Sequence, residues 1–188
     1  MALLFTLFLK KSNIMEKLNI KYFTAFLVLF IIGCETPVKT VGFNTWENYS
    51  DSKFTIGSEE SIETALSFNE AWDNRDFEEA KSLSTDSIRF VIGDGIPRDW
   101  DYVIEVNNYR DSVRAANGAT VESEIKRIFS IQLEPNKTGT EAVHASIVYT
   151  YESDTEYNQW RQYETFFIRD GLVRRWSATG QDIVEDDE

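Results

Sequence analysis

Cysteine and histidine each occur only once in this sequence, as Cys34 and His144. A single cysteine cannot form an intrachain disulfide. One cysteine and one histidine are also too few ligands for a zinc site built from these residue types. The glycine patterns that bind nucleotide phosphates are missing as well. We therefore expect no metal and no cofactor. Strand alternation should turn His144 away from the face of Val143, Ala145 and Ile147, so a Ser-His-Asp triad is not expected either.

Positive charge is also scarce. The chain has 19 lysines and arginines against 32 aspartates and glutamates, and a formal net charge of −13. Such a surface repels polyanions, so we expect no nucleic-acid partner. The acids are dense in residues 181–188, for which we predict an acidic tail.

Long apolar runs are missing too. The run at 23–32 is interrupted only by a threonine, but it falls well short of the ~20 residues that span a bilayer. Lys17 and Lys21 precede it and the small residue Gly33 follows it, which is the layout of a secretory signal. Because a signal of ordinary length begins at Met15, we take Met15 as the expected start; an extended leader that begins at Met1 is the alternative.

The end of this signal carries a more specific pattern. Ile31-Ile32-Gly33-Cys34 resembles the bacterial lipobox, in which the cysteine is lipidated and becomes the mature N-terminus. We predict a lipoprotein signal peptide over 1–33, lipid attachment at Cys34 and a tether over 34–57. The protein would then sit in the bacterial cell envelope, anchored to the inner or outer membrane, with its domain in the periplasm or at the cell surface. An ordinary signal peptide is the alternative.

The next stretch predicts a long amphipathic helix. Ser58 can cap it, and acidic residues in its first turn favour the positive end of the helix dipole. Asn74 can adopt the left-handed conformation that ends it. Its apolar face has helical spacing and comprises Ile62, Ala65, Leu66, Phe68 and Trp72.

Shorter signals place the remaining elements. Asp76 can cap a second helix, and Asp99 can cap a third over 100–116. Asp170-Gly171 is a strong turn signal for a hairpin. Runs of alternating or β-branched residues predict strands at 87–92, 120–133, 141–151, 160–169 and 172–179.

This order of elements, with Ala-Trp and an aspartate at the end of the first helix (residues 71–76), resembles the start of nuclear transport factor 2-like domains. The SnoaL-like and ketosteroid isomerase-like proteins belong to this group. The stretch from Phe166 to Val173 resembles the final hairpin of that family. The resemblance covers about 58–180 and implies an α+β fold: a cone-shaped, curved antiparallel sheet wrapped around N-terminal helices, with an internal pocket.

The resemblance can be tested for catalytic residues. Ketosteroid isomerases place an oxyanion-binding tyrosine where this chain has Phe68, and a general-base aspartate about where it has Val91, so neither function carries over. Asp94 can serve as an acid or base in the loop after the first strand. Arg127 stands among apolar neighbours and needs a partner, for which Glu164 is a candidate. A turn-forming Asp94 and a snorkelling Arg127 are the structural alternatives.

Counting back from the Asp170-Gly171 turn predicts the hairpin register. Phe167 should pair with Arg174, Thr165 with Trp176, and Tyr163 with Ala178, which places three aromatics on one interior face. Aromatic side chains around a cavity bind flat apolar ligands, although they also fill cores. The expected pocket-lining residues are Phe68, Trp72, Phe90, Tyr149, Tyr163, Phe167 and Trp176.

These observations predict a lipid-anchored protein whose pocket binds a small apolar ligand or a protein partner without catalysing a reaction. One alternative is an isomerase or hydrolase of a small apolar substrate, in which polar groups converge on one buried point. A second is a homodimer that associates through the outer face of the sheet. In that case the interior should be filled and an apolar patch should lie outside it.

Overall fold

The computed structural model describes residues 40–43, 52–134 and 138–183. Cys34, the predicted signal peptide and most of the predicted tether lie outside these residues. Within the described residues, no helix is both long and apolar enough to cross a membrane.

Three helices occupy the positions that their caps predict. They are α2 (Glu59–Asp73), α3 (Phe77–Ser82) and α4 (Trp100–Ala116). The side chains of Ser58, Asp76 and Asp99 each accept a hydrogen bond from a backbone amide in the first turn, as expected for N-caps.

The end of α2 differs from the prediction in one residue. Asn74 remains right-handed (φ −77°), and it is Arg75 that takes the left-handed conformation, with φ 62°. A side chain other than glycine or asparagine rarely adopts this conformation. Arg75 is held in it by its own contacts, which include a hydrogen bond of 2.8 Å from its Nη1 to the carbonyl of Trp72.

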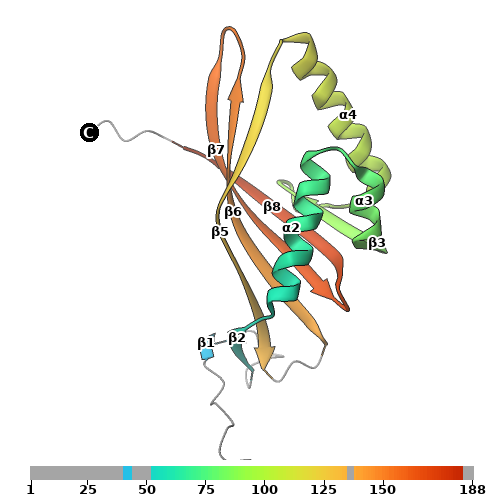
Figure 1. Ribbon diagram of the computed structural model, residues 1–188, viewed down its shortest axis with the longest axis vertical. Helices are drawn as coiled ribbons and strands as arrows, with labels where there is room; N and C mark the ends of the chain where they lie inside the picture. Colours follow the sequence, from blue (N-terminus) through green and yellow to red (C-terminus); the bar gives the residue numbers. More distant parts are fainter. Residues whose placement is uncertain (1–39, 44–51, 135–137, 184–188) are drawn as a thin grey trace, which may run out of the picture. The chain divides into compact units, whose positions relative to one another are not determined.

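The described strands form one mixed sheet. They are β1 (Thr40–Phe43), β2 (Lys53–Ile56), β3 (Ser84–Ile92), β4 (Pro97–Arg98), β5 (Thr120–Glu134), β6 (Thr140–Glu152), β7 (Tyr157–Arg169) and β8 (Leu172–Asp182). Their order is β1-β2-β5-β6-β7-β8-β3-β4. Every neighbouring pair is antiparallel except β3 and β8. The sheet is curved, and α2, α3 and α4 lie on one side of it (Figure 1). The predicted α+β class is confirmed.

The sheet extends beyond the bounds expected from the sequence. Strands β1 and β2 lie within the predicted tether, and β2 pairs with the end of β5. The side chain of Thr55 is only 2% exposed there. At the other end, β8 continues to Asp182, past the predicted end of the domain at 180.

Two β-bulges shift the side-chain pattern of the long strands. In β5, Ile125 pairs with Ile147 and Arg127 with Ser146, so that Lys126 is the extra residue. In β8, Phe167 pairs with Arg175 and Ile168 with Val173, so that Arg174 is the extra residue. Next to the turn, Arg169 pairs with Leu172, as counting from the turn predicts, but the three pairs predicted beyond it are wrong. The bulge moves every later residue of β8 by one position.

An aromatic cluster fills the space between α2 and the sheet. Helix α2 packs against β5, β6, β7 and β8. The indoles of Trp72 and Trp176 meet edge to face, with ring centroids 4.7 Å apart, and Phe68 meets Phe166 at 6.0 Å. The interior face predicted for β6 is confirmed, since Val143, Ala145 and Ile147 are buried and Tyr149 packs against the core.

Candidate functional site

A cavity of about 440 Å³ lies beneath α4. Helix α4 makes its main contacts with β3, which lies next to the edge strand β4. The cavity lies between this helix and residues of β7 and β8. The volume of the cavity falls within the range typical of small-molecule sites. The apolar part of the wall is formed by Trp72, Val103, Val106, Trp160, Trp176 and Ala178.

One face of α4 forms the roof of this cavity. Val103 and Asn107 are its buried residues, and Val106, Arg110 and Arg114 follow on the same side at helical spacing. The apolar residues Tyr109 and Val113 lie elsewhere on the helix and are exposed, at 69% and 42%. The face that α4 turns inward is thus apolar in its first turns and cationic in its last.

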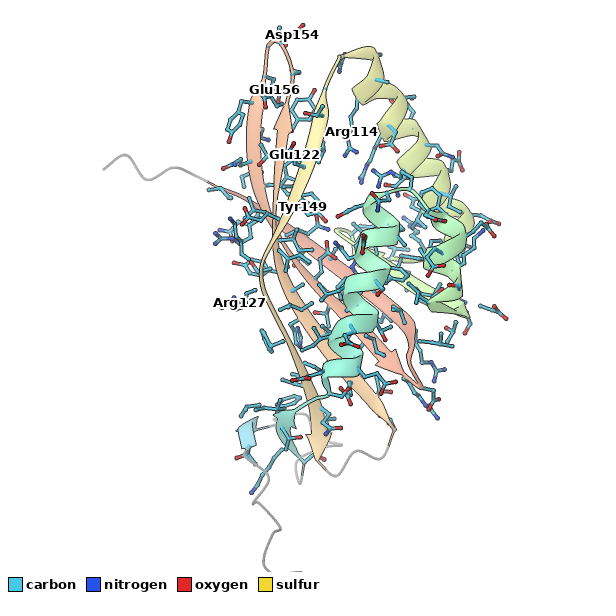
Figure 2. The ribbon with its side chains drawn as sticks, viewed as in Figure 1. Arg114, Glu122, Arg127, Tyr149, Asp154 and Glu156 are labelled. Atoms are coloured by element: carbon cyan, nitrogen blue, oxygen red, sulfur yellow. The ribbon has the colours of Figure 1, made fainter. Side chains whose placement is uncertain are left out.

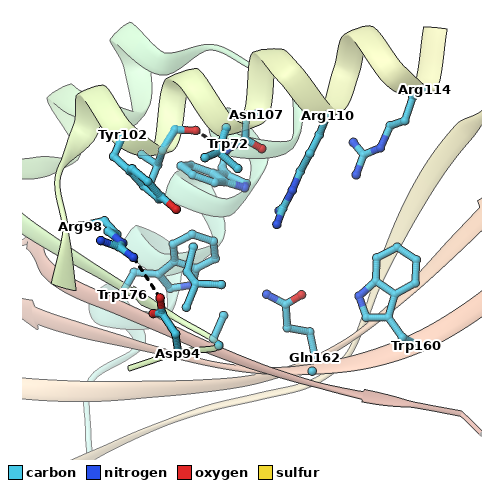
Figure 3. A pocket seen from close by; sticks show the side chains of 16 residues that line it. Trp72, Asp94, Arg98, Tyr102, Asn107, Arg110, Arg114, Trp160, Gln162 and Trp176 are labelled. Carbon is cyan, nitrogen blue, oxygen red and sulfur yellow. Dashed lines mark hydrogen bonds and ion pairs between the residues drawn. The ribbon is translucent and has the colours of Figure 1, made fainter. Parts of the chain in front are cut away.

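The cationic end of the cavity continues into a smaller one of about 140 Å³. Both cavities are lined by Arg110, Arg114, Trp160 and Gln162. Figure 3 shows the two arginines pointing from α4 toward Gln162 and Trp160 on the opposite wall. The smaller cavity adds polar groups from Asp73, Arg75, Ser123 and Tyr149. The two cavities thus adjoin at these four shared residues, the larger one with a mostly apolar wall and the smaller one with a polar wall.

A single carboxylate pairs with two of the arginines at the polar end. Asp111 accepts hydrogen bonds from Nε and Nη2 of Arg75, at 2.6 and 3.1 Å, and from Nη1 of Arg114 at 3.0 Å. The hydrogen bond from Arg75 is the main reason that the pKa of Asp111 lies below its usual value. This network fixes Arg75 and Arg114 in place.

The mouth of the cavity on the β3 side carries an ion pair. Nη2 of Arg98 lies 2.9 Å from Oδ2 of Asp94, and the guanidinium of Arg98 also covers the ring of Tyr102, 4.5 Å from its centroid. The Asp94 carboxylate accepts the backbone amide of Ile96 as well. Asp94 therefore shapes the loop, which is the turn-forming role expected of it as the alternative to an acid or base.

Glu164 is a buried acid behind the cavity wall. Its Oε2 accepts the indole N–H of Trp176 at 2.8 Å, and its Oε1 accepts the hydroxyl of Tyr149 at 3.0 Å. Burial raises the pKa of Glu164 to about 7, although both hydrogen bonds favour the ionised form. Burial, followed by the charge of Glu164, raises the pKa of Tyr149. Glu164 therefore connects Trp176, in the wall of the large cavity, with Tyr149, in the wall of the small one.

The structure separates the three catalytic candidates. Asp94 lies at the cavity mouth, and Glu164 lies in the core at 1% exposure. Arg127 lies on the far face of the sheet, away from the helices (Figure 2). Because Lys126 is bulged out, the residues after it exchange faces, and Arg127 is exposed on the outer face of the sheet, where it lies beside Phe129. The expected contact between Arg127 and Glu164 is therefore not formed.

The predicted pocket-lining residues are distributed over three environments. Trp72 and Trp176 line the large cavity and Tyr149 the small one, while Phe68 and Phe90 are buried in the core. Tyr163 and Phe167 were expected to line the pocket but do not. Their neighbours Glu164, Phe166 and Ile168 point inward, so these two side chains point outward.

The outer face of the sheet has a shallow hollow of its own. It is lined by Arg127, Phe129, His144 and Tyr163, among others. The ring of His144 stacks on Phe129 at 5.3 Å, and its Nδ1 lies 3.0 Å from the hydroxyl of Thr165. Burial lowers the pKa of His144. Phe129 and Tyr163 are 44% and 42% exposed, so this face carries apolar surface outside the core.

The described residues contain no group of three or more histidine, cysteine, aspartate or glutamate side chains that could hold a metal ion. Among the residues that line the cavities, Arg110, Arg114 and Gln162 were not predicted from the sequence. The two arginines follow Val103 by seven and eleven positions, and this spacing places them on its side of the helix.

Solved structures show what this architecture is similar to. A loop-truncation variant of IdmH, a protein of Streptomyces antibioticus, matches with a TM-score of 0.50 at 14% identity, over 64% of this chain and 92% of that one. The beta subunit of benzoate 1,2-dioxygenase from Burkholderia mallei matches at 0.49 and 8% identity, over 68% and 92%. An LEH-like epoxide hydrolase from M. tuberculosis matches at 0.44 and 18% identity, over 66% and 80%.

The domain has the nuclear transport factor 2-like fold. No family model matches the sequence, and neither does a curated protein. At these identities the structural neighbours establish the fold alone, and a fold does not determine an activity. The function must therefore be argued from the cavity and its residues.

Proposed function

We propose that this protein is a lipid-anchored protein of the bacterial cell envelope whose domain binds a small ligand with a flat, apolar body. The observation that carries the proposal is the cavity beneath α4, whose wall presents the indoles of Trp72, Trp160 and Trp176. Aromatic walls of this kind bind flat apolar groups well, because their large surfaces are desolvated together.

Binding is favoured over catalysis by the way the polar groups are arranged. Glu164, Tyr149 and Trp176 do converge on one buried point, but there they hydrogen-bond one another. The Asp94 carboxylate is paired with Arg98. A general acid or base needs an oxygen within reach of the substrate. The cavity also argues against a module that works only through its outer face, since such a module needs no interior space.

Filling the cavity should abolish ligand binding. Val106 lies on the cavity side of α4, so we expect Val106→Trp to weaken binding of 1-pyrenemethanol, a neutral flat probe, at least about tenfold. Binding to the full-length chain is measured as quenching of tryptophan fluorescence, because three indoles line the site. Val113→Trp, on an exposed position of the same helix, is the matched control and should bind as the wild type does. Equal binding by both variants contradicts the proposal.

Anchoring can be tested separately. Cys34→Ser should move the protein from the membrane fraction to the soluble fraction while its thermal unfolding stays the same, because the lipid and not the domain holds it at the membrane. Labelling with a radioactive fatty acid is expected for the wild type and not for the variant. A mature protein that carries no label and starts at another residue contradicts lipid anchoring and leaves the cavity proposal intact.

A further inference from the structure

One cation in the cavity has no counter-charge. Among the described residues, Asp111 pairs with Arg75 and Arg114, and Asp94 pairs with Arg98. The side chain of Arg110, an exposed residue that lines both cavities, forms no ion pair or hydrogen bond. Figure 3 shows its side chain reaching from α4 into the space between the helix and Gln162. An arginine that points into a cavity without a partner is poised to receive an anion.

The surroundings of Arg110 are positive although the protein is not. The polar end of the cavity is lined by Arg75, Arg110 and Arg114 and by the acid Asp73, and Asp111 stands behind two of these arginines. With Asp73 and Asp111 ionised and the buried Glu164 protonated, the sum is one positive charge. The chain as a whole carries −13. A positive site within a negative molecule attracts anions to this one place and repels them elsewhere.

We propose, on the basis of the ligand-binding function above, that the natural ligand is a monocarboxylic acid. Its carboxylate would be bound by Arg110 and Gln162, and its flat apolar body would lie between the indoles of Trp160 and Trp176. Guanidinium groups bind carboxylates through two parallel hydrogen bonds, and the amide of Gln162 can donate a further one. One excess positive charge matches one carboxylate. A phosphate dianion would face Asp73 and Asp111 with its second charge uncompensated.

The indole of Trp160 is held in place to receive the apolar body. It stacks on the ring of Tyr149 with centroids 5.3 Å apart and an interplanar angle of 10°. The hydroxyl of Tyr149 is in turn fixed by Glu164, which also holds the indole of Trp176. Both walls of the site are therefore ordered by the same buried acid, and little side-chain entropy is lost on binding.

The test compares a charged and a neutral probe of the same shape. The dissociation constants of 1-pyrenecarboxylate and 1-pyrenemethanol are measured by tryptophan quenching with the full-length chain. We expect the carboxylate to bind about tenfold more tightly than the alcohol. Arg110→Gln should remove this preference and leave the affinity for 1-pyrenemethanol unchanged. Raising the salt concentration should weaken the binding of 1-pyrenecarboxylate and leave the binding of 1-pyrenemethanol unchanged.

The matched control is Arg161→Gln. Arg161 lies between Trp160 and Gln162 on β7, is exposed, and faces the other side of the sheet by strand alternation. Arg161→Gln changes the net charge by the same amount as Arg110→Gln does. This control variant should still bind 1-pyrenecarboxylate more tightly than 1-pyrenemethanol. If Arg110→Gln binds both probes as the wild type does, the assignment of the carboxylate site is wrong, and the ligand-binding function survives. If the wild type binds neither probe, both proposals are wrong.

Discussion

Replacing Trp72 by alanine is expected to lower the free energy of unfolding by about 3–5 kcal/mol. The indole is 7% exposed and touches rings from four other elements, including Phe90 on β3 and Trp176 on β8. A side chain of this kind buries about 150–250 Å², and the surrounding aromatic rings are too stiff to fill the space it leaves. Urea unfolding followed by circular dichroism measures the effect.

Trp160→Ala is the matched control for this prediction. Trp160 is only half-buried and contacts the cavity, so its removal opens the site without opening the core. We expect a clearly smaller loss of stability from it. A domain of this size has only about 5–15 kcal/mol of stability in total, so the difference between the two variants is large. Nearly equal midpoints for Trp72→Ala and the wild type would show that α2 does not pack against the sheet as described.

Replacing Glu164 by glutamine is expected to change how stability depends on pH. The pKa of Glu164 rises from its usual value of 4.5 to about 7 on folding, so the folded state binds this proton more tightly than the unfolded state does. The stabilisation is complete below pH 4.5 and is lost as the pH rises through 7. A shift of this size corresponds to about 3 kcal/mol. Glu164→Gln removes this contribution, because an amide does not titrate.

The measurement is the free energy of unfolding of wild type and variant at pH 4.5 and pH 8. The stability of Glu164→Gln relative to the wild type should rise by about 3 kcal/mol from the lower to the higher pH. Groups with lowered pKa values, such as Asp111, act in the opposite direction but equally in both proteins. Glu122→Gln, at an exposed position of β5, should show no such rise. A stability difference for Glu164→Gln that is the same at both pH values contradicts the burial of this acid.

The helices were predictable because their signals are local. The caps at Ser58, Asp76 and Asp99 depend on residues within three positions, and the structure places each helix start where its cap predicts. The apolar face of α2 was mostly predictable for the same reason: Ala65, Phe68 and Trp72 are buried as expected. Leu66, which was assigned to the same face, is 38% exposed. The face of α4 was not, because this helix stands over a cavity and leaves several apolar side chains in solvent.

The strand faces were only partly predictable, because alternation fails at a bulge. Strand β6 has none, and its predicted interior face is correct. In β5 and β8 a pair of basic residues, Lys126-Arg127 and Arg174-Arg175, stands at the irregular position. The inward-facing residues on either side, such as Val173 and Trp176, are then three positions apart instead of two. This spacing was present in the sequence, and it signals a bulge where strict alternation would bury a charge.

The site was the least predictable part, since its residues come from elements that are distant in the chain. Arg110 lies on α4, Trp160 and Gln162 on β7, and Trp176 on β8. No local pattern links them, and only the sheet order brings β7 and β8 beneath the helix. That Arg110 lacks a partner is likewise a property of the folded chain, because it depends on Asp111 being taken by Arg75 and Arg114.

The most direct test of this account is a crystal structure of the full-length chain with 1-pyrenecarboxylate. We expect the pyrene rings between the indoles of Trp160 and Trp176, with the carboxylate within hydrogen-bond distance of the Arg110 guanidinium. A probe seated instead in the hollow of the outer face, beside Phe129 and His144, would contradict the account. So would α4 packed down on the sheet with no space beneath it.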